Sequence, residues 1–498
     1  MSQRTARTAA TAAVHALRTT LVAALAPAAV LAGFAAPGHA QVKRPDQITY
    51  PPLPAFEAPS PERVVLDNGM VVMLVEDHEL PLVQAVAVVR TGRRYDPPEK
   101  VSLARLTGEV LRTGGTESLS ADELDDFLES RAATIESSIG EDVGRVSMSS
   151  LTDDFPEVLR VFADVLRRPA FAAGRLEVAK NAVRATVARR NDEPQGIVFR
   201  EIQRVVYGAD SPYARIPEYS TLAAVTREDL VRWHETYYHP DRIILGLVGD
   251  FDAEQALRSI REVFGDWTRS GGTETPDVWY DEEPSPGLYL AAKSDVTQAN
   301  IAMGHLGIRR DHPDYYALRV LNQIFSGGAS SRLYSEVRTR RGLAYGVFGQ
   351  VGADWDHPGL TLVWTSTKVE STGEALEVLL AESEALRGER PPTPKEVAEA
   401  KNAILSSFVF EVDSAEEVLR EQVTLEAFGY PLDRVAKFRE RIDAVTVEDV
   451  RRVAREQLHP DRFAIVVVGP SEQLAPQLEP FGEVTELDIT IPPPPAAE

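Results

Sequence analysis

The sequence predicts an α+β fold of two homologous domains, each a largely antiparallel sheet packed with helices. The first observation is an internal repeat, because Thr226–Leu230 (TREDL) recurs 220 residues later as Thr446–Val450 (TVEDV). Each copy precedes a helical pattern, the tetrapeptide His-Pro-Asp-Arg and a β-rich run that ends in Val-Gly. The second observation is that strand patterns neighbour one another without a regular alternation of strand and helix, which favours antiparallel pairing. A repeat unit this long indicates a duplicated domain rather than a solenoid.

The elements of the first half follow in chain order. Arg63–Glu76 (RVVLDNGMVVMLVE) holds two alternating apolar runs around Asp67-Asn68-Gly69, which predicts a β-hairpin. Leu82–Arg90 is a further strand pattern. Ser120 precedes an acidic first turn, which is typical of a helix N-cap. Helices are predicted over Ser102–Arg112, Ser120–Glu129, Asp154–Leu166, Leu176–Arg189 and Arg227–Tyr238.

The N-terminus has the layout of a secretory signal peptide. Three arginines within the first 18 residues precede an apolar run over Leu21–Ala36, and small residues follow up to Ala40. The run contains a proline and is short for a membrane span of ~20 residues. We therefore expect an exported protein, most simply in a bacterial periplasm, with no membrane span after cleavage. The expected parts are a signal peptide (1–40), a Pro-rich N-terminal segment (41–60), a first domain (61–269), a linker (270–286), a second domain (287–473) and a C-terminal tail (474–498).

Composition excludes several classes of function. The 498 residues include no cysteine, so a disulfide scaffold, an iron–sulfur centre, a thiolate zinc site and a cysteine nucleophile are all excluded. The net charge of −23 argues against a nucleic-acid partner, because phosphate binding needs a basic face. Any metal would have to be held by His, Asp or Glu.

The order of motifs resembles that of a known peptidase family. A hairpin at Val64–Gly69 precedes a helical stretch that ends at Gly115-Thr116. This arrangement, and the rest of the chain up to Pro470, is similar to the pitrilysin/insulinase family of zinc peptidases, which includes the mitochondrial processing peptidase. The resemblance implies the two-domain fold of that family.

The resemblance also locates a degenerate zinc site. Members of the family carry H-x-x-E-H on this helix, and the matching residues here are Leu106 to Val110 (LTGEV). Only Glu109 matches, since Leu106 and Val110 replace the two histidines, and Thr186 stands where the family has its third ligand. Leucine and valine have no lone pair to donate to a metal. We therefore expect no metal or other cofactor in this chain.

One other histidine pair imitates a zinc motif. His234 and His239 are five residues apart, which places their side chains ~140° apart around a helix. His239 also recurs as His459 before the same Pro-Asp-Arg, which indicates a structural role. We expect no metal there.

The second half preserves a different part of the family's machinery. The segment from Ser326 to Tyr345 (SGGASSRLYSEVRTRRGLAY) is similar to the family's glycine-rich segment and its R-x6-Y pair, with Arg338 and Tyr345 as the pair. The resemblance implies that Arg338 and Tyr345 donate hydrogen bonds to the scissile carbonyl oxygen and to the oxyanion formed from it, a task that suits a guanidinium and a phenol. The residues expected to contact substrate are Gly327, Gly328 and Ser330.

A lost zinc site beside a retained Arg/Tyr pair resembles the non-catalytic subunits of two-chain members of the family. The resemblance implies a subunit that is inactive alone and pairs with a zinc-bearing homologous subunit, in which zinc is expected. The substrate would be an unfolded peptide held by strand addition to a sheet edge. If the acidic charge lines the peptide chamber, it would favour basic peptides. Two alternatives remain: a structural or peptide-binding module with no role in hydrolysis, and a self-sufficient peptidase with a site of another kind.

Overall fold

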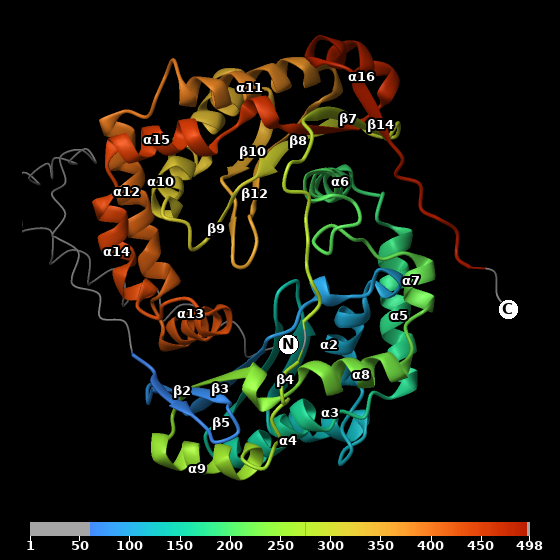
Figure 1. The fold of residues 1–498 in the computed structure, drawn as a ribbon, viewed down its shortest axis with the longest axis vertical. Helices are drawn as coiled ribbons and strands as arrows, with labels where there is room; N and C mark the ends of the chain where they lie inside the picture. The colour runs from blue at the N-terminus through green and yellow to red at the C-terminus, as the bar shows by residue number, and fades with distance from the viewer. Residues whose placement is uncertain (1–59, 274, 496–498) are drawn as a thin grey trace, which may run out of the picture. The chain divides into compact units, whose positions relative to one another are not determined.

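The computed structural model describes residues 60–495 except residue 274. The expected signal peptide (1–40) and nearly all of the expected Pro-rich segment (41–60) lie outside the described residues, as do residues 496–498. Within residues 60–495 the chain forms two six-stranded sheets, each packed with helices (Figure 1). The predicted α+β fold of two similar domains is confirmed.

The first sheet has the strand order β1-β2-β6-β3-β5-β4 and is antiparallel except where β2 pairs with β6. Its first two strands form the predicted hairpin. The turn is fixed by Asn68, whose Nδ2 donates to the Phe264 carbonyl at 2.7 Å, and by Gly69, whose φ of +88° suits glycine. The strands are β1 (Glu62–Val65), β2 (Val71–Glu76), β3 (Leu82–Val89), β4 (Thr134–Ile139), β5 (Gly144–Leu151) and β6 (Ile243–Gly249).

The second sheet has the order β10-β12-β8-β13-β7-β14, so its edge strand β10 corresponds to β4 of the first sheet. β7 pairs in parallel with both β13 and β14, and the other pairs are antiparallel. A short parallel pair, β9 (Ile308–Arg309) with β11 (Ala353–Asp354), stands apart from it. The strands are β7 (Gly287–Ala292), β8 (Gln298–Leu306), β10 (Ala344–Gln350), β12 (Leu360–Lys368), β13 (Ala464–Gly469) and β14 (Val484–Leu487).

The helices of the first half include all those predicted. The repeated motif has a physical role, because Thr226 and Thr446 each form a capping box with the aspartate three residues later. The helices are α2 (Leu103–Thr113), α3 (Ala121–Glu129), α4 (Phe155–Arg167), α5 (Ala173–Ala188), α6 (Pro194–Tyr207), α7 (Tyr219–Ala223), α8 (Arg227–Tyr237) and α9 (Ala253–Phe264). In the second half they are α10 (Tyr315–Ser326), α11 (Thr372–Arg387), α12 (Pro394–Phe408), α13 (Ala415–Phe428), α14 (Arg434–Ala444), α15 (Val447–Gln457) and α16 (Ser471–Leu478).

The two halves exchange one helix each, α6 and α13 (Figure 1). Helix α13 packs on the first sheet, where Leu419 and Val423 join a buried cluster on β2 and β6. A Cβ at Gly246 would lie 2.8 Å from a methyl carbon of Val423, so this glycine permits the close approach. Helix α6 packs on the second sheet, with Ile202 and Val206 fully buried against β8 and β13. Each half therefore completes the core of the other.

The second domain extends beyond the expected boundary at residue 473, which corrects the expected tail. Helix α16 continues to Leu478, and β14 (Val484–Leu487) pairs with β7. Part of the carboxyl-terminal segment is thus a strand of the second sheet. The proline-rich sequence at its end had favoured an extended tail instead. Between α9 and β7 the described residues contain no helix or strand. None of the helices in the described part of the chain is both long enough and apolar enough to cross a bilayer.

Candidate functional site

The structure brings Arg338 and Tyr345 into direct contact. Arg338 lies on a π-helical segment, η5 (Tyr334–Arg340), and Tyr345 on the edge strand β10. The guanidinium carbon of Arg338 lies 4.4 Å from the ring centroid of Tyr345 and 4.9 Å from that of Tyr334. Tyr345 is 84% exposed, which is unusual for a large aromatic side chain. The pair therefore presents a guanidinium held between two rings, with a phenol beside it at the surface.

The donors of this pair are uncommitted. Among the described residues, no carboxylate lies within ion-pair distance of Arg338, and no side-chain hydrogen bond reaches either Arg338 or the Tyr345 hydroxyl. The neighbouring Arg340 differs, because it pairs with Glu336 at 2.8 Å. Stacking on aromatic faces holds a guanidinium in place while leaving its N–H groups free at the rim.

Backbone hydrogen bonds and a buried valine hold the segment that carries Arg338 and Tyr345. The Arg341 N–H donates to the Glu336 carbonyl, a π-helical bond, and the Leu343 N–H donates to the Val337 carbonyl at 2.9 Å. Val337 is fully buried, and Gly342 turns the chain into β10 with a φ of +64°. The backbone at Arg338 and Tyr345 is therefore fixed, and the Tyr345 side chain projects outward.

The glycine-rich residues lie beside β10. Gly327 ends α10, and a Cβ there would lie 2.3 Å from the side-chain oxygen of Gln323. Gly328 has a φ of +124°, which favours glycine. The Ser326 hydroxyl donates to the Gly349 carbonyl, which links this turn to the edge strand. Ser330 is exposed.

Two of the four expected zinc-site positions form part of the first core. Leu106 and Val110, one turn apart on α2, are both 0% exposed and pack in the main apolar cluster of the first half. Glu109 is half-buried on the same helix. Thr186 is exposed on α5 and donates its hydroxyl to the Ala182 carbonyl at 3.1 Å. Only one of these four side chains carries a carboxylate and none an imidazole, so they do not fit a zinc ion. No described contact joins them to Arg338 or Tyr345.

The two histidines that imitate a zinc motif, His234 and His239, make hydrogen bonds to backbone carbonyls. The Nε2 atom of His234 lies 2.8 Å from the Leu166 carbonyl, and burial lowers the pKa of this imidazole to about 4. The Nε2 atom of His239 lies 2.8 Å from the Glu235 carbonyl. A neutral imidazole that donates to a carbonyl has no lone pair at that nitrogen for a metal.

Sequence reasoning missed a charged cluster that joins the two halves. Asp142, Asp356 and His357 have possible ligand atoms within 4.8 Å of one another. Arg94 already pairs with both carboxylates of the cluster, because its Nη1 donates to Asp142 at 2.9 Å and also to Asp356. Burial and the nearby Asp356 raise the pKa of Asp142 to about 7. His357 stacks on Tyr213 with ring centroids 3.8 Å apart. The cluster is an ion-pair network. No motif spacing predicts it, since Asp142 precedes Asp356 and His357 by more than 200 residues.

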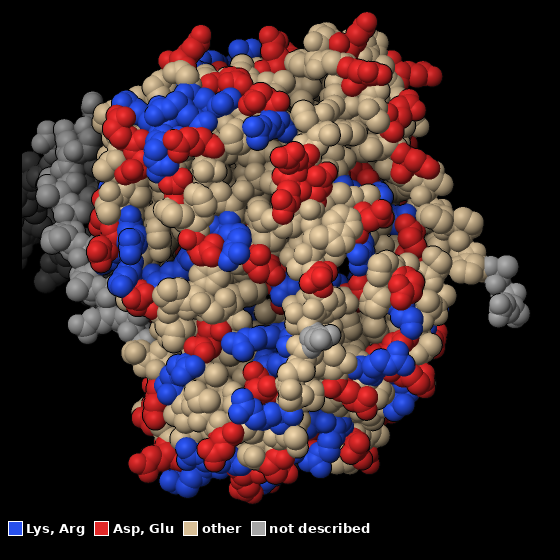
Figure 2. Space-filling view, viewed as in Figure 1, with Lys and Arg blue, Asp and Glu red and all other residues tan. Residues whose placement is uncertain are grey.

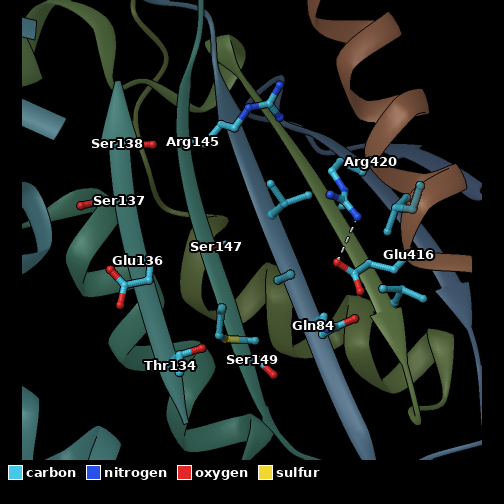
Figure 3. A pocket seen from close by; sticks show the side chains of 16 residues that line it. Gln84, Thr134, Glu136, Ser137, Ser138, Arg145, Ser147, Ser149, Glu416 and Arg420 are labelled. Atoms are coloured by element: carbon cyan, nitrogen blue, oxygen red, sulfur yellow. Dashed lines mark hydrogen bonds and ion pairs between the residues drawn. The ribbon is translucent and has the colours of Figure 1, made fainter. Parts of the chain in front are cut away.

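A polar groove runs along the first sheet (Figure 3). Its cavity of about 840 Å³ lies between β3, β4 and β5 on one side and α13 on the other. Strand β4 is an edge strand, paired only with β5 among the described residues. Serines, threonine and glutamine dominate the strand side, and Glu416 and Arg420 face them from α13. The labelled strand residues are Gln84, Thr134, Glu136, Ser137, Ser138, Arg145, Ser147 and Ser149. An edge strand that has a strand partner on one side only, beside a polar groove, can accept an extended peptide.

Comparison with known proteins identifies the family. Residues 71–214 match the model of insulinase (peptidase family M16), and residues 224–404 match the model of the peptidase M16 inactive domain. The chain belongs to the M16 peptidase family. The family resemblance expected from the sequence is thereby confirmed.

Relatives of this M16 chain share nearly its whole described length. An uncharacterized zinc protease of Bacillus subtilis, YmxG, is 24% identical over 417 residues, covering 82% of this chain and 98% of its own. A peptidase M16 inactive-domain protein from Pseudomonas fluorescens superposes with a TM-score of 0.74 at 26% identity, covering 82% of this chain and 98% of its own. The periplasmic protease PqqL of Escherichia coli superposes with a TM-score of 0.70 at 17% identity, covering 85% of this chain and 47% of its own. The last likeness bears on the fold alone.

Proposed function

We propose that this chain is the non-metallated subunit of a heteromeric, exported M16 endopeptidase. The proposal rests on a contrast within one chain. Arg338 and Tyr345 present free hydrogen-bond donors, whereas Leu106 and Val110 fill the expected zinc position with apolar side chains of the core. The chain therefore supplies donors and half of a peptide chamber, and a zinc-bearing homologous subunit supplies the metal. An exported location fits the expected signal peptide.

The chemistry assigned to this chain is stabilisation of developing charge. The carbonyl oxygen of a scissile peptide bond gains negative charge as water adds to it. Donors already aimed at that oxygen favour the transition state, because no reorganisation is needed at the moment of reaction. The Arg338 guanidinium offers a charged donor and the Tyr345 hydroxyl a neutral one. The metal and the activated water are expected in the partner subunit. This chain therefore needs to supply no metal ligand.

The proposed substrate is an unfolded peptide. The edge strand β4 and the groove beside it would bind an extended backbone by strand addition, in which main-chain hydrogen bonds give affinity and the groove side chains give selectivity. Peptide binding of this kind is shared with the alternative, a binding module without a role in hydrolysis. The Arg/Tyr pair distinguishes the two.

Tyr345→Phe should lower the turnover number of the mixed enzyme about tenfold. The change removes one hydroxyl and keeps the ring that Arg338 stacks on, and one neutral hydrogen bond contributes ~1.4 kcal/mol. The measurement is kcat and KM of the zinc-bearing homologue mixed with each variant on a quenched-fluorescence peptide. Tyr289→Phe, on β7, is the matched control. Unchanged kcat with Tyr345→Phe would favour the binding-module alternative.

A further inference from the structure

A second cavity, beside the groove, is lined by arginines. It has a volume of about 590 Å³ and lies among α10, α13 and α14 and the loop that holds Trp355. We call it the arginine pocket, defined by Arg145, Arg310, Arg319, Arg420 and Arg434. Three glutamates also line it: Glu411, Glu417 and Glu421. Five arginines around one cavity are notable in a chain of net charge −23, on whose visible face acidic and basic side chains are otherwise interspersed (Figure 2).

Three of these arginines have no carboxylate partner within ion-pair distance among the described residues. Arg145 reaches only the Thr424 hydroxyl, at 3.5 Å. Arg310 donates from Nε to the Ala353 carbonyl at 3.3 Å. Arg434 donates from Nη1 to the Arg310 carbonyl at 3.0 Å.

These three arginines are partly buried, and a buried guanidinium nitrogen without an acceptor is costly. The Nη1 atom of Arg145 and the Nη2 atom of Arg434 are buried without a hydrogen-bond acceptor. Burial lowers the pKa of Arg145, and the nearby Arg420 lowers it further. The charged form of Arg145 is therefore disfavoured at this position. Proteins ordinarily pair buried charges, so guanidinium groups without a carboxylate partner are suited to an anionic ligand.

Aromatic rings hold the guanidinium groups in place. The Arg310 guanidinium carbon lies 4.0 Å from the Trp355 ring centroid, and that of Arg434 lies 4.4 Å from the Tyr315 centroid. Glu421 also lines the pocket, but no ion pair within 4.0 Å joins it to these arginines, and burial raises its pKa against the opposing effect of Arg310 and Arg434. Stacked guanidinium groups with free edges are suited to carboxylates, which accept hydrogen bonds from such an edge.

The pocket continues the proposed peptide groove. Arg145 and Arg420 line both cavities, and Figure 3 shows them at one end of the groove, above Glu416. We propose that the arginine pocket binds a carboxylate of the peptide in the groove, so that the chain selects acidic peptides or peptide C-termini. The proposal rests on the proposed peptide groove and not on hydrolysis. It reverses the expectation that the acidic composition would favour basic peptides.

The test measures binding to the isolated mature chain, without the partner subunit. Fluorescence anisotropy gives Kd for a short unstructured peptide with one central glutamate and a free C-terminus. The same peptide is also tested with glutamine in place of glutamate, with an amidated C-terminus, and with both changes. We expect the doubly neutralised peptide to bind at least about tenfold more weakly, since charge-assisted hydrogen bonds are lost. The single change that reproduces the loss identifies the source of the carboxylate. Equal affinity for all four peptides would overturn the proposal.

Variants assign the effect to the pocket. Arg310→Gln and, separately, Arg145→Gln should bring the four affinities within about twofold of one another. Arg258→Gln is the matched control, because Arg258 is exposed on α9 and pairs only with Glu254. Arg145→Gln should not lower the thermal midpoint, because it removes an unpaired buried charge. A preference for acidic peptides that survives both pocket variants would contradict the proposal.

A small-molecule titration separates the pocket from the groove. Glutarate is added to the isolated chain while tryptophan fluorescence is recorded, with Trp355→Phe assigning the signal to the ring under Arg310. One outcome is that no peptide binds, while glutarate still gives a saturable Trp355 response that Arg310→Gln abolishes. The pocket would then be a carboxylate site, and the proposed peptide groove would be wrong. If neither peptide nor glutarate binds, the arginine pocket is not a carboxylate site.

Discussion

Arg338→Ala should lower the turnover number of the mixed enzyme roughly 100-fold. Removing one preorganised donor to a developing oxyanion costs ~3 kcal/mol of transition-state stabilisation, and each ~1.4 kcal/mol is tenfold in rate. The effect is expected to exceed that of Tyr345→Phe, because the guanidinium is charged and its stacking also places the Tyr345 ring. The loss should appear in kcat, with KM changed little, if the donors act mainly in the transition state.

The control for Arg338 lies in the same segment. Arg340→Ala removes an arginine that is exposed and already paired with Glu336, so kcat should stay within about twofold of the wild type. Size-exclusion chromatography of both mixtures checks that the complex still forms. A normal kcat with Arg338→Ala in an intact complex would remove the catalytic assignment and leave the chain as a binding module.

Leu106→His should destabilise the isolated chain by about 2–4 kcal/mol. The change returns an imidazole to the position where the family has its first zinc histidine, but Leu106 is now fully buried in an apolar cluster. The imidazole would lose apolar burial and place two polar nitrogens where no partner is available. Urea unfolding at neutral pH measures the change in the free energy of unfolding.

Glu109→His provides the comparison for Leu106. Glu109 lies on the same helix but is only half-buried, with no side-chain partner among the described residues, so its replacement should cost less than ~1 kcal/mol. Equal stability of the Leu106→His variant and the wild type would mean that position 106 still has room and water for a ligand. The zinc position would then be vacant rather than closed.

Local patterns accounted for most of the fold. Apolar alternation predicted the hairpin around Asn68 and Gly69, and capping residues predicted helix starts, because both are set by neighbours in the sequence. The repeated Thr-x-x-Asp predicted equivalent helices, which form as capping boxes in both halves. The contact between Arg338 and Tyr345 is also local, since the two residues are seven apart and Gly342 turns the chain between them.

Features that depend on distant packing were not predictable from the sequence. The exchange of α6 and α13 leaves no local trace, since each helix has an ordinary apolar face and only tertiary contact decides which sheet it covers. The pairing of β14 with β7 was not predictable either, because the two strands are nearly 200 residues apart and β14 has no apolar alternation. The arginine pocket collects residues from β5, α10, α13, α14 and the end of β9, so no spacing announces it.

We propose above that this chain contributes donors to a metal site held by another chain. The direct measurement is zinc content and peptide cleavage of the purified mature chain, alone and mixed with a homologue that carries intact H-x-x-E-H. We expect no stoichiometric zinc and no cleavage by the chain alone, and cleavage by the mixture well above that of the homologue alone. One zinc per isolated chain with cleavage, or a mixture no more active than the homologue, would contradict it.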